Sequence, residues 1–282
     1  MTVRVVTDSS ADLDRAVADE HAVAVVPLKV RFDEEEFTDG VDLSPEEFWK
    51  RLRATNVLPH TTSPSPGDFE QAFSQLDAEG ASGIVCVTLS SKVSATHQSA
   101  RLAAERFKGR CHVAVVDSLS VSAGLGNLCQ AAAKHAEAGE DLETVVAETE
   151  RLRDSIAYYG AVESLEFLRR GGRIGAARAL LGSALSIRPL LSFEQGTVEV
   201  AGKVRTRQRS LEWIVECVAA DSPVESVTAL HADAADIDVL HEMLASLVPG
   251  QEVVVSLMGP VMGTHLGPGG VGATYFRTTT PD

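Results

Sequence analysis

Three apolar runs in the first half of the chain each end in a short polar turn and lead into a helical stretch. The runs cover residues 3–7, 83–89 and 113–116. Continuous apolar strands that are separated by helices are typical of a parallel sheet covered on both faces. In such sheets, ligands bind beyond the carboxyl ends of the strands, where helix N-termini offer free N–H groups. We therefore predict an α/β fold with a candidate binding edge at these turns.

The second half of the chain has a different pattern. A strand at 157–162 is followed by a short helix and by a basic, glycine-rich loop at 169–175. Two further apolar runs flank a turn at 194–196, which predicts a β-hairpin. No low-complexity linker separates the halves, so we place the boundary where the pattern changes. This gives an N-terminal α/β domain at residues 1–160 and a C-terminal domain at 161–282.

The charge of the chain narrows its possible partners. A formal charge of −15 argues against nucleic acid, and so against a DNA-linked regulator, because binding phosphates needs a basic surface. An anionic membrane would repel the same surface. The first residues lack the regions of a signal peptide, and no apolar run approaches the length of a membrane-spanning helix. We expect a cytoplasmic protein without integral membrane association.

Metal-binding patterns are missing from the sequence. Cys86, Cys111, Cys129 and Cys217 are scattered, without CxxC or Cys/His spacing, which favours free thiols over a zinc site or disulfides. The acidic residues 33–36 are expected to form a solvated turn. We predict neither a metal nor a cofactor.

Nucleotide and hydrolase motifs are missing as well. The chain has no GxGxxG after its first strand, no GxxxxGK[ST] loop and no GxSxG nucleophile elbow. Ser94 and His265 could still act together as a nucleophile and base, because catalytic partners need to be neighbours only in space. That arrangement needs an acidic residue to orient the imidazole, and the sequence nominates none. An acyl hydrolase or acyltransferase therefore stays as the alternative function.

Small polar clusters lie next to apolar runs at three places in the chain. They contain Thr62 with Ser63, Ser94 with Thr96, and His265 between two nearby glycines. Hydroxyls and an imidazole can hold a carboxylate or phosphate head, and glycine lets the backbone approach a ligand closely. The alternative for His265 is a structural hydrogen bond, which is the commoner role of a lone histidine.

Six short motifs, taken together and in their order, resemble one protein family. They are VTDSS at 6–10, TTSPSP at 61–66, LSSKVSAT at 89–96, VDS at 116–118, LRRGGRI at 168–174 and HLGPG at 265–269. The chain resembles the DegV family of bacterial fatty-acid-binding proteins over nearly its whole length. The family's pattern departs here at Ala95, where a glycine is expected, and at Leu266, where a threonine is common.

This resemblance implies a fold and a function. The fold is a two-domain α/β fold with a parallel sheet in the first domain and a mixed sheet in the second, and one long-chain fatty acid is held between them. The function is that of a lipid-binding protein and not of an enzyme. Such a protein presents the carboxyl group to a separate fatty acid kinase, and the acyl phosphate that results feeds phospholipid synthesis.

The resemblance also implies roles for single residues. Thr62 and Ser94 match the hydroxyls that hold the carboxyl group, and His265 matches a nearby histidine. Other residues are expected around the head group: Ser63, Thr96, Asp8, Ser9 and Gly267. Asp8 and Ser9 follow a strand, so the alternative for them is a helix cap.

Basic residues are assigned less narrowly. Arg170 and Arg173 match the family's basic loop, which implies a place near the head group or at the kinase interface. Lys203 and Arg207 belong to the densest basic run of the chain, at 203–209. They are expected either to dock the kinase electrostatically or to form an ordinary solvated face.

Overall fold

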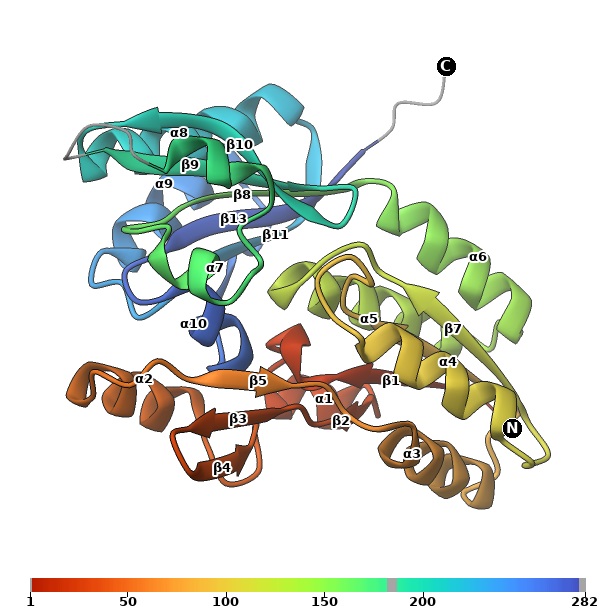
Figure 1. Cartoon of the computed structure of the whole chain (residues 1–282). Helices are drawn as coiled ribbons and strands as arrows, with labels where there is room; N and C mark the ends of the chain where they lie inside the picture. Colours follow the sequence, from red (N-terminus) through yellow and green to blue (C-terminus); the bar gives the residue numbers. More distant parts are fainter. Residues whose placement is uncertain (1, 182–186, 279–282) are drawn as a thin grey trace.

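The computed structural model describes residues 2–181 and 187–278, which form two main sheets, one in each half of the chain (Figure 1). The first sheet has the strand order β2-β1-β6-β7, and all of its strands run parallel. Its strands are β1 (Val3–Asp8), β2 (Ala24–Val26), β6 (Gly83–Thr88) and β7 (His112–Asp117).

Helices cover both faces of this sheet. In β6, Ile84 and Cys86 pack against helices α3 (Pro66–Ala78) and α4 (Thr96–Arg106). Val85 and Val87 pack against α5 (Ser122–Glu137) and α6 (Leu142–Arg153) on the other face. Each face therefore takes alternate residues of an entirely buried strand. This confirms the predicted parallel sheet. This half also contains the helix α1 (Arg15–Glu20) and a 3₁₀ turn η1 (Ser9–Ala11).

A small antiparallel sheet, in the order β4-β3-β5, lies beside the first sheet. Its strands are β3 (Lys29–Phe32), β4 (Glu35–Thr38) and β5 (His60–Thr62). The prediction of a solvated turn at 33–36 was wrong for its second half, because Glu35 and Glu36 belong to β4. Glu36 pairs with Lys29 across the strands at 2.7 Å, and Glu35 pairs with Arg51 at 3.1 Å. These ion pairs let two acidic residues enter a strand.

The second sheet has six strands in the order β10-β9-β8-β13-β11-β12. Neighbouring strands in this sheet run antiparallel, except for the parallel pair β11 and β12, so the sheet is mixed, as expected. The strands are β8 (Ile156–Ala161), β9 (Arg188–Glu194), β10 (Thr197–Val204), β11 (Val224–His231), β12 (Val254–Leu257) and β13 (Val271–Arg277). The boundary predicted between 160 and 161 falls inside β8, and the second sheet begins at Ile156.

Two layers of helices flank the second sheet. Helices α8 (Arg207–Asp221) and α9 (Ile237–Leu247) pack on one face. The short elements α7 (Glu166–Arg170), η2 (Gly175–Leu180) and α10 (Pro260–Leu266) complete this half. Figure 1 shows α7 and α10 between the second sheet and the first half of the chain.

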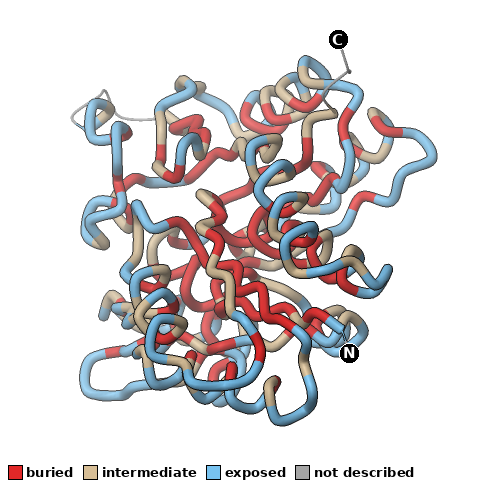
Figure 2. Tube along the Cα trace, turned by 90° about the vertical axis from the view of Figure 1, so that its right-hand side faces the viewer, coloured by how far each residue is buried: buried red, intermediate tan, exposed pale blue. Residues whose placement is uncertain are grey.

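The two halves meet in a shared apolar core. This core contains Leu28 and Trp49 from the first half and Met258 and Met262 from the second. Trp49, on α2 (Pro45–Ala54), donates a hydrogen bond from Nε1 to the carbonyl oxygen of Met258 at 2.9 Å. Figure 2 shows buried segments gathered through the middle of the molecule and exposed ones around it. Across the described ranges, no helix is long and apolar enough to cross a membrane.

Candidate functional site

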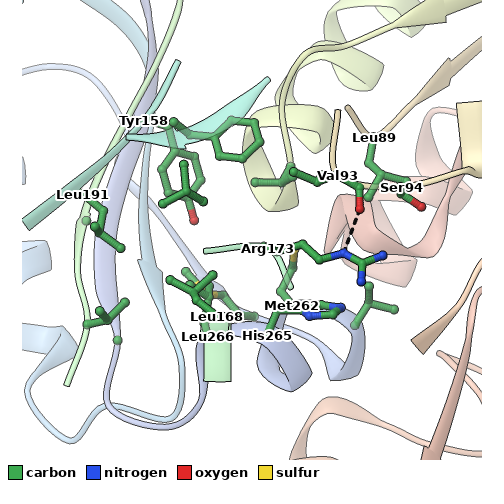
Figure 3. Close-up of a pocket in the computed structure, with 18 of the residues that line it drawn as sticks. Leu89, Val93, Ser94, Tyr158, Leu168, Arg173, Leu191, Met262, His265 and Leu266 are labelled. Atoms are coloured by element: carbon green, nitrogen blue, oxygen red, sulfur yellow. Dashed lines mark hydrogen bonds between the residues drawn. The ribbon is translucent and has the colours of Figure 1, made fainter. Parts of the chain in front are cut away.

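A cavity lies between the two halves and is lined mainly by apolar side chains. It has about 970 Å³ of space between atoms, counted out to its open mouth. The apolar lining includes Leu28, Leu89, Val93 and Val121 from the first half, and Leu168, Leu191, Val261 and Met262 from the second. Figure 3 shows Leu191, Leu168 and Tyr158 on one side of this space, and Ser94, Arg173 and His265 toward the other.

The polar end of the cavity is built from hydroxyl groups of the first half. Ser63 and Ser94 are joined through their Oγ atoms at 3.1 Å, and Ser94 Oγ lies 2.9 Å from Thr96 Oγ1. The amide of Thr96 donates to Ser94 Oγ at 3.3 Å, which fixes the turn between β6 and α4. Thr61, Ser63 and Ser94 line the cavity. Thr96 is buried behind them.

Thr62 does not line the cavity. Thr61 pairs with Val30 in the middle of β5, and successive residues of a strand point to opposite sides. Thr61 and Ser63 therefore face the cavity, whereas Thr62 between them is exposed. The predicted segment thus borders the cavity through Thr61 and Ser63, whereas the predicted residue, Thr62, lies in β5 and points away from it.

His265 closes the polar end from the opposite side. It lies in the last turn of α10, and its Nε2 is 2.9 Å from Thr61 Oγ1. Burial, with a smaller effect of the charges of Arg173 and His60, lowers the pKa of this imidazole to about 4. The ring is therefore neutral at pH 7 and takes part in the site as a hydrogen-bonding group and not as a cation.

Gly171 makes room for the His265 ring. A side chain at this position would overlap the imidazole at Nδ1. Among the described residues, Nδ1 is buried and has no hydrogen-bond partner, so no carboxylate orients the ring. The hydrogen bond of His265 goes to Thr61 and not to Ser94. This geometry does not favour the nucleophile–base pair that was kept as the alternative function.

Two arginines lie at the outer side of the polar end. Arg173 lines the cavity and donates from Nε to the carbonyl oxygen of Val93 at 2.9 Å and from Nη1 to that of Gly171 at 2.7 Å (Figure 3). A second hollow outside His265 is lined by Arg173 and Arg170, together with His60. Arg170 also pairs with Glu166 one helical turn earlier.

Other predicted residues hold the frame of the site. Asp8 is buried and accepts hydrogen bonds from the amides of Ser10 at 3.1 Å and Leu89 at 2.8 Å. Burial raises the pKa of Asp8 to about 6, against the opposing effect of these bonds. Ser9 Oγ accepts from the amide of Leu28 at 3.0 Å. Gly267 ends α10 with φ of +70°, a conformation that favours glycine.

The two residues predicted from the basic run at 203–209 differ in their surroundings. Arg207 forms a two-pronged ion pair with Asp236, at 2.8 and 2.7 Å, and donates to the carbonyl oxygen of Gly269 at 2.8 Å. It therefore anchors the loop after α10. Lys203 is exposed on β10 and remains accessible.

Sequence reasoning missed Thr61 and Tyr158 as cavity residues. The strand alternation of β5 was the available signal for Thr61. Tyr158 lies on β8, packs against Phe193 with ring centroids 6.3 Å apart, and faces the cavity from the second sheet. No group of three or more His, Cys, Asp or Glu side chains within residues 2–181 and 187–278 is arranged to hold a metal ion.

Comparisons with known proteins agree with this architecture. Residues 2–278 match the family model described as "Uncharacterised protein, DegV family". A DegV domain-containing protein of Listeria innocua is 35% identical over 277 residues, which is 97% of this chain and 98% of that protein. One from Streptomyces coelicolor is 37% identical over 277 residues, 96% of each.

Solved structures give the same result. A DegV family protein from Thermus thermophilus, described as fatty acid binding, has 36% identity and a TM-score of 0.90, covering 99% of this chain and 100% of that one. DegV from Bacillus subtilis, described as a fatty acid binding protein, has 28% identity and a TM-score of 0.89 with the same coverage. On the match over residues 2–278, the chain belongs to the DegV family.

Proposed function

We propose that this protein binds one long-chain fatty acid in the cavity between its two halves. The acyl chain lies among the apolar side chains, and the carboxyl group lies at the end formed by Ser94, Thr61, Ser63 and His265. The observation that carries this proposal is the polar cluster at one end of a cavity whose lining is mainly apolar. The solved DegV proteins of T. thermophilus and B. subtilis, which are described as fatty acid binding, support it.

The free energy of burying a fatty acid is favourable in a cavity with this lining. Each buried methylene contributes about 0.8 kcal/mol, so a chain of roughly fifteen methylenes gains on the order of 12 kcal/mol before the costs of binding. A buried carboxyl group is costly unless it is hydrogen-bonded. Hydroxyls and a neutral imidazole can donate or accept, so they serve both the acid and its anion.

We further propose that the protein presents the bound carboxyl group to a separate fatty acid kinase and does not perform the chemistry itself. The kinase would phosphorylate the carboxylate in the cytoplasm, and the acyl phosphate would feed phospholipid synthesis. Two features support this role. The head-group end borders the outer hollow lined by Arg170 and Arg173, and Lys203 is exposed on the surface. We give Arg207 a structural role and no role in docking, because its guanidinium already binds Asp236 and the carbonyl oxygen of Gly269.

Binding and presentation are tested separately. Delipidated protein is titrated by calorimetry with a C16–C18 fatty acid and with its methyl ester, which lacks the acidic head. We expect one site per chain for the acid and weaker binding for the ester. Loaded protein is then mixed with ATP and a bacterial fatty acid kinase, and acyl phosphate is trapped with hydroxylamine. Equal affinity for acid and ester would contradict the head-group assignment, and a loaded protein that yields no acyl hydroxamate with a kinase from the same cell would contradict presentation.

A further inference from the structure

A groove lies next to the lipid cavity, apart from the hollow outside His265. It has about 1,810 Å³ of space, counted out to open solvent, and its lining includes Asp12, Ala123, Gly259 and Pro260. Residues one or two positions away in the chain line the cavity instead: Val121 before α5, and Met258 and Val261 around the start of α10. A single layer of residues therefore separates the cavity from the groove.

The carboxyl group of Asp12 holds this layer together. Its Oδ2 accepts a hydrogen bond from Ser122 Oγ at 2.5 Å, and its Oδ1 accepts one from the amide of Gly259 at 2.9 Å. Asp12 ends the turn after β1, Ser122 begins α5, and Gly259 caps α10. One side chain thus joins three segments that are far apart in the sequence, and no role of Asp12 follows from the head-group site.

The backbone at this junction is shaped for the contact. Asp12 and Ser122 both adopt left-handed conformations, with φ of +47° and +52°. Such conformations are unfavourable for a non-glycine residue and persist where the surroundings hold them. A Cβ on Gly259 would come within 2.8 Å of Asp12 Oδ1. Loss of the carboxyl contacts would therefore leave two strained segments free to relax.

The segment that Asp12 holds carries a large part of the binding site. Four residues of α10 line the cavity: Val261, Met262, His265 and Leu266. A shift of the start of α10 away from Asp12 would open the wall next to Met258 and Val261. It would also disturb the contact of His265 with Thr61 at the other end of the helix.

We propose that Asp12 is a latch that keeps the cavity closed toward the groove and sets the rate at which the lipid exchanges. With the carboxyl engaged, the starts of α5 and α10 are held together and the acyl chain is enclosed. With it released, the cavity joins the groove and the chain can leave. Asp12 is a positioning residue in this proposal, which rests on the proposed binding of a fatty acid.

The charge state of Asp12 makes the closure of this wall depend on pH. Loss of solvation at this partly buried carboxyl raises its pKa to about 8, with smaller contributions from the charges of Asp39 and Asp8, against the hydrogen bonds of Ser122 and Gly259. Burial also raises the pKa of Asp39 to about 7, and the pKa of the nearby Tyr158 phenol is raised as well. In an open wall the carboxyl would return toward 3.8. Its raised pKa in the closed wall means that closure is favoured at low pH and loosened as pH rises from about 4 to about 8.

Release kinetics test the latch. Protein loaded with cis-parinaric acid, a fluorescent C18 fatty acid, is mixed with excess albumin, and the decay of fluorescence gives the release rate. Asp12→Gly, which suits the left-handed backbone, is expected to release the probe about tenfold faster or more. Asp12→Asn keeps an acceptor for Gly259 but cannot ionise, so it should release slowly and show less acceleration between pH 6 and pH 8. Asp14→Asn, an exposed helix cap beside the same groove, is the matched control and should match wild type.

A second readout does not depend on the ligand. Hydrogen exchange of the Gly259 amide, which donates to Asp12, should be faster in Asp12→Gly and unchanged in Asp14→Asn. If Asp12→Gly fails to fold, Gly259→Ala, whose methyl group pushes against the carboxyl, should give the same faster release. Folded variants that release the probe at the wild-type rate would overturn the latch. If the wild type binds no fatty acid, the proposed function fails, and unchanged exchange at Gly259 in Asp12→Gly would then reject the latch independently.

Discussion

Thr61 Oγ1 and His265 Nε2 lie 2.9 Å apart and join strand β5 of the first half to helix α10 of the second. This hydrogen bond crosses the junction of the two halves at the polar end of the cavity. Both groups are neutral at pH 7, because burial lowers the pKa of His265 to about 4. The polar end therefore presents neutral hydrogen-bonding groups from both halves, with Arg173 held beside them by carbonyl oxygens.

The hydroxyl groups at this polar end should contribute measurably to the affinity for a fatty acid. The double variant Thr61→Val with Ser94→Ala should weaken fatty acid binding roughly tenfold to a hundredfold, because each lost hydrogen bond costs about 0.5–1.5 kcal/mol. Calorimetric titration with a C16–C18 acid measures the change. Thr62→Val is the matched control and should bind like wild type, since Thr62 is exposed. A loss of affinity in Thr62→Val instead of the double variant would reverse this assignment.

The apolar side of the cavity should limit the length of the acyl chain. Leu191 is buried on β9 and lines the cavity, so Leu191→Trp should reduce binding of C18 acids more than that of C12 acids. Competition against a fluorescent fatty acid gives the preference for each length. Val200→Trp, at an exposed position on the neighbouring strand, should leave the preference unchanged. An equal loss for every chain length would mean that the acyl chain does not pass Leu191.

The neutral state of His265 predicts a pH dependence of stability. Because the folded pKa lies near 4 and the ordinary value is 6.5, the unfolded chain binds the proton more readily. The stability linked to this residue is therefore present above pH 6.5 and is lost as pH falls toward 4. Urea denaturation at pH 7 and pH 5 should show a smaller loss in His265→Gln than in wild type. Identical losses in both proteins would show that the imidazole is not held neutral.

Lys203 and Arg207 should respond differently to mutation. Arg207→Ala should lower the free energy of unfolding by about 1–3 kcal/mol, because it removes charged hydrogen bonds to Asp236 and Gly269. Lys203→Glu should leave the melting temperature unchanged and slow association with the kinase, most strongly at low salt. Differential scanning fluorimetry and stopped-flow association separate the two effects. If Lys203→Glu does not change the rate of association, Lys203 does not belong to the proposed kinase interface.

Much of the fold follows from local patterns in the sequence. The apolar strand β6 and the helices on each side of it predicted a covered parallel sheet, because burial on both faces requires apolar residues at every position. The hairpin of β9 and β10 followed from its turn at Gln195–Gly196, where both residues have positive φ. The strand β4 was not foreseen, since its stability depends on partners of Glu35 and Glu36 in other elements.

The site was predicted to the level of segments and less well to the level of side chains. Ser94 and His265 lie at the same polar end, as the family resemblance implied. The family resemblance implied Thr62 and not Thr61, and a shift of one residue in a strand reverses the side that a side chain faces. The roles of Arg207 and Asp12 depend on contacts with residues distant in the sequence, so no local pattern could identify them.

Native mass spectrometry of the protein as purified shows whether this chain holds a fatty acid. Organic extraction would then identify any lipid that is released. We predict one bound species per chain with the mass of a long-chain fatty acid, retained in Thr62→Val and reduced in the variant that combines Thr61→Val with Ser94→Ala. A protein that is empty as purified, and that takes up no fatty acid when one is added, would contradict the account.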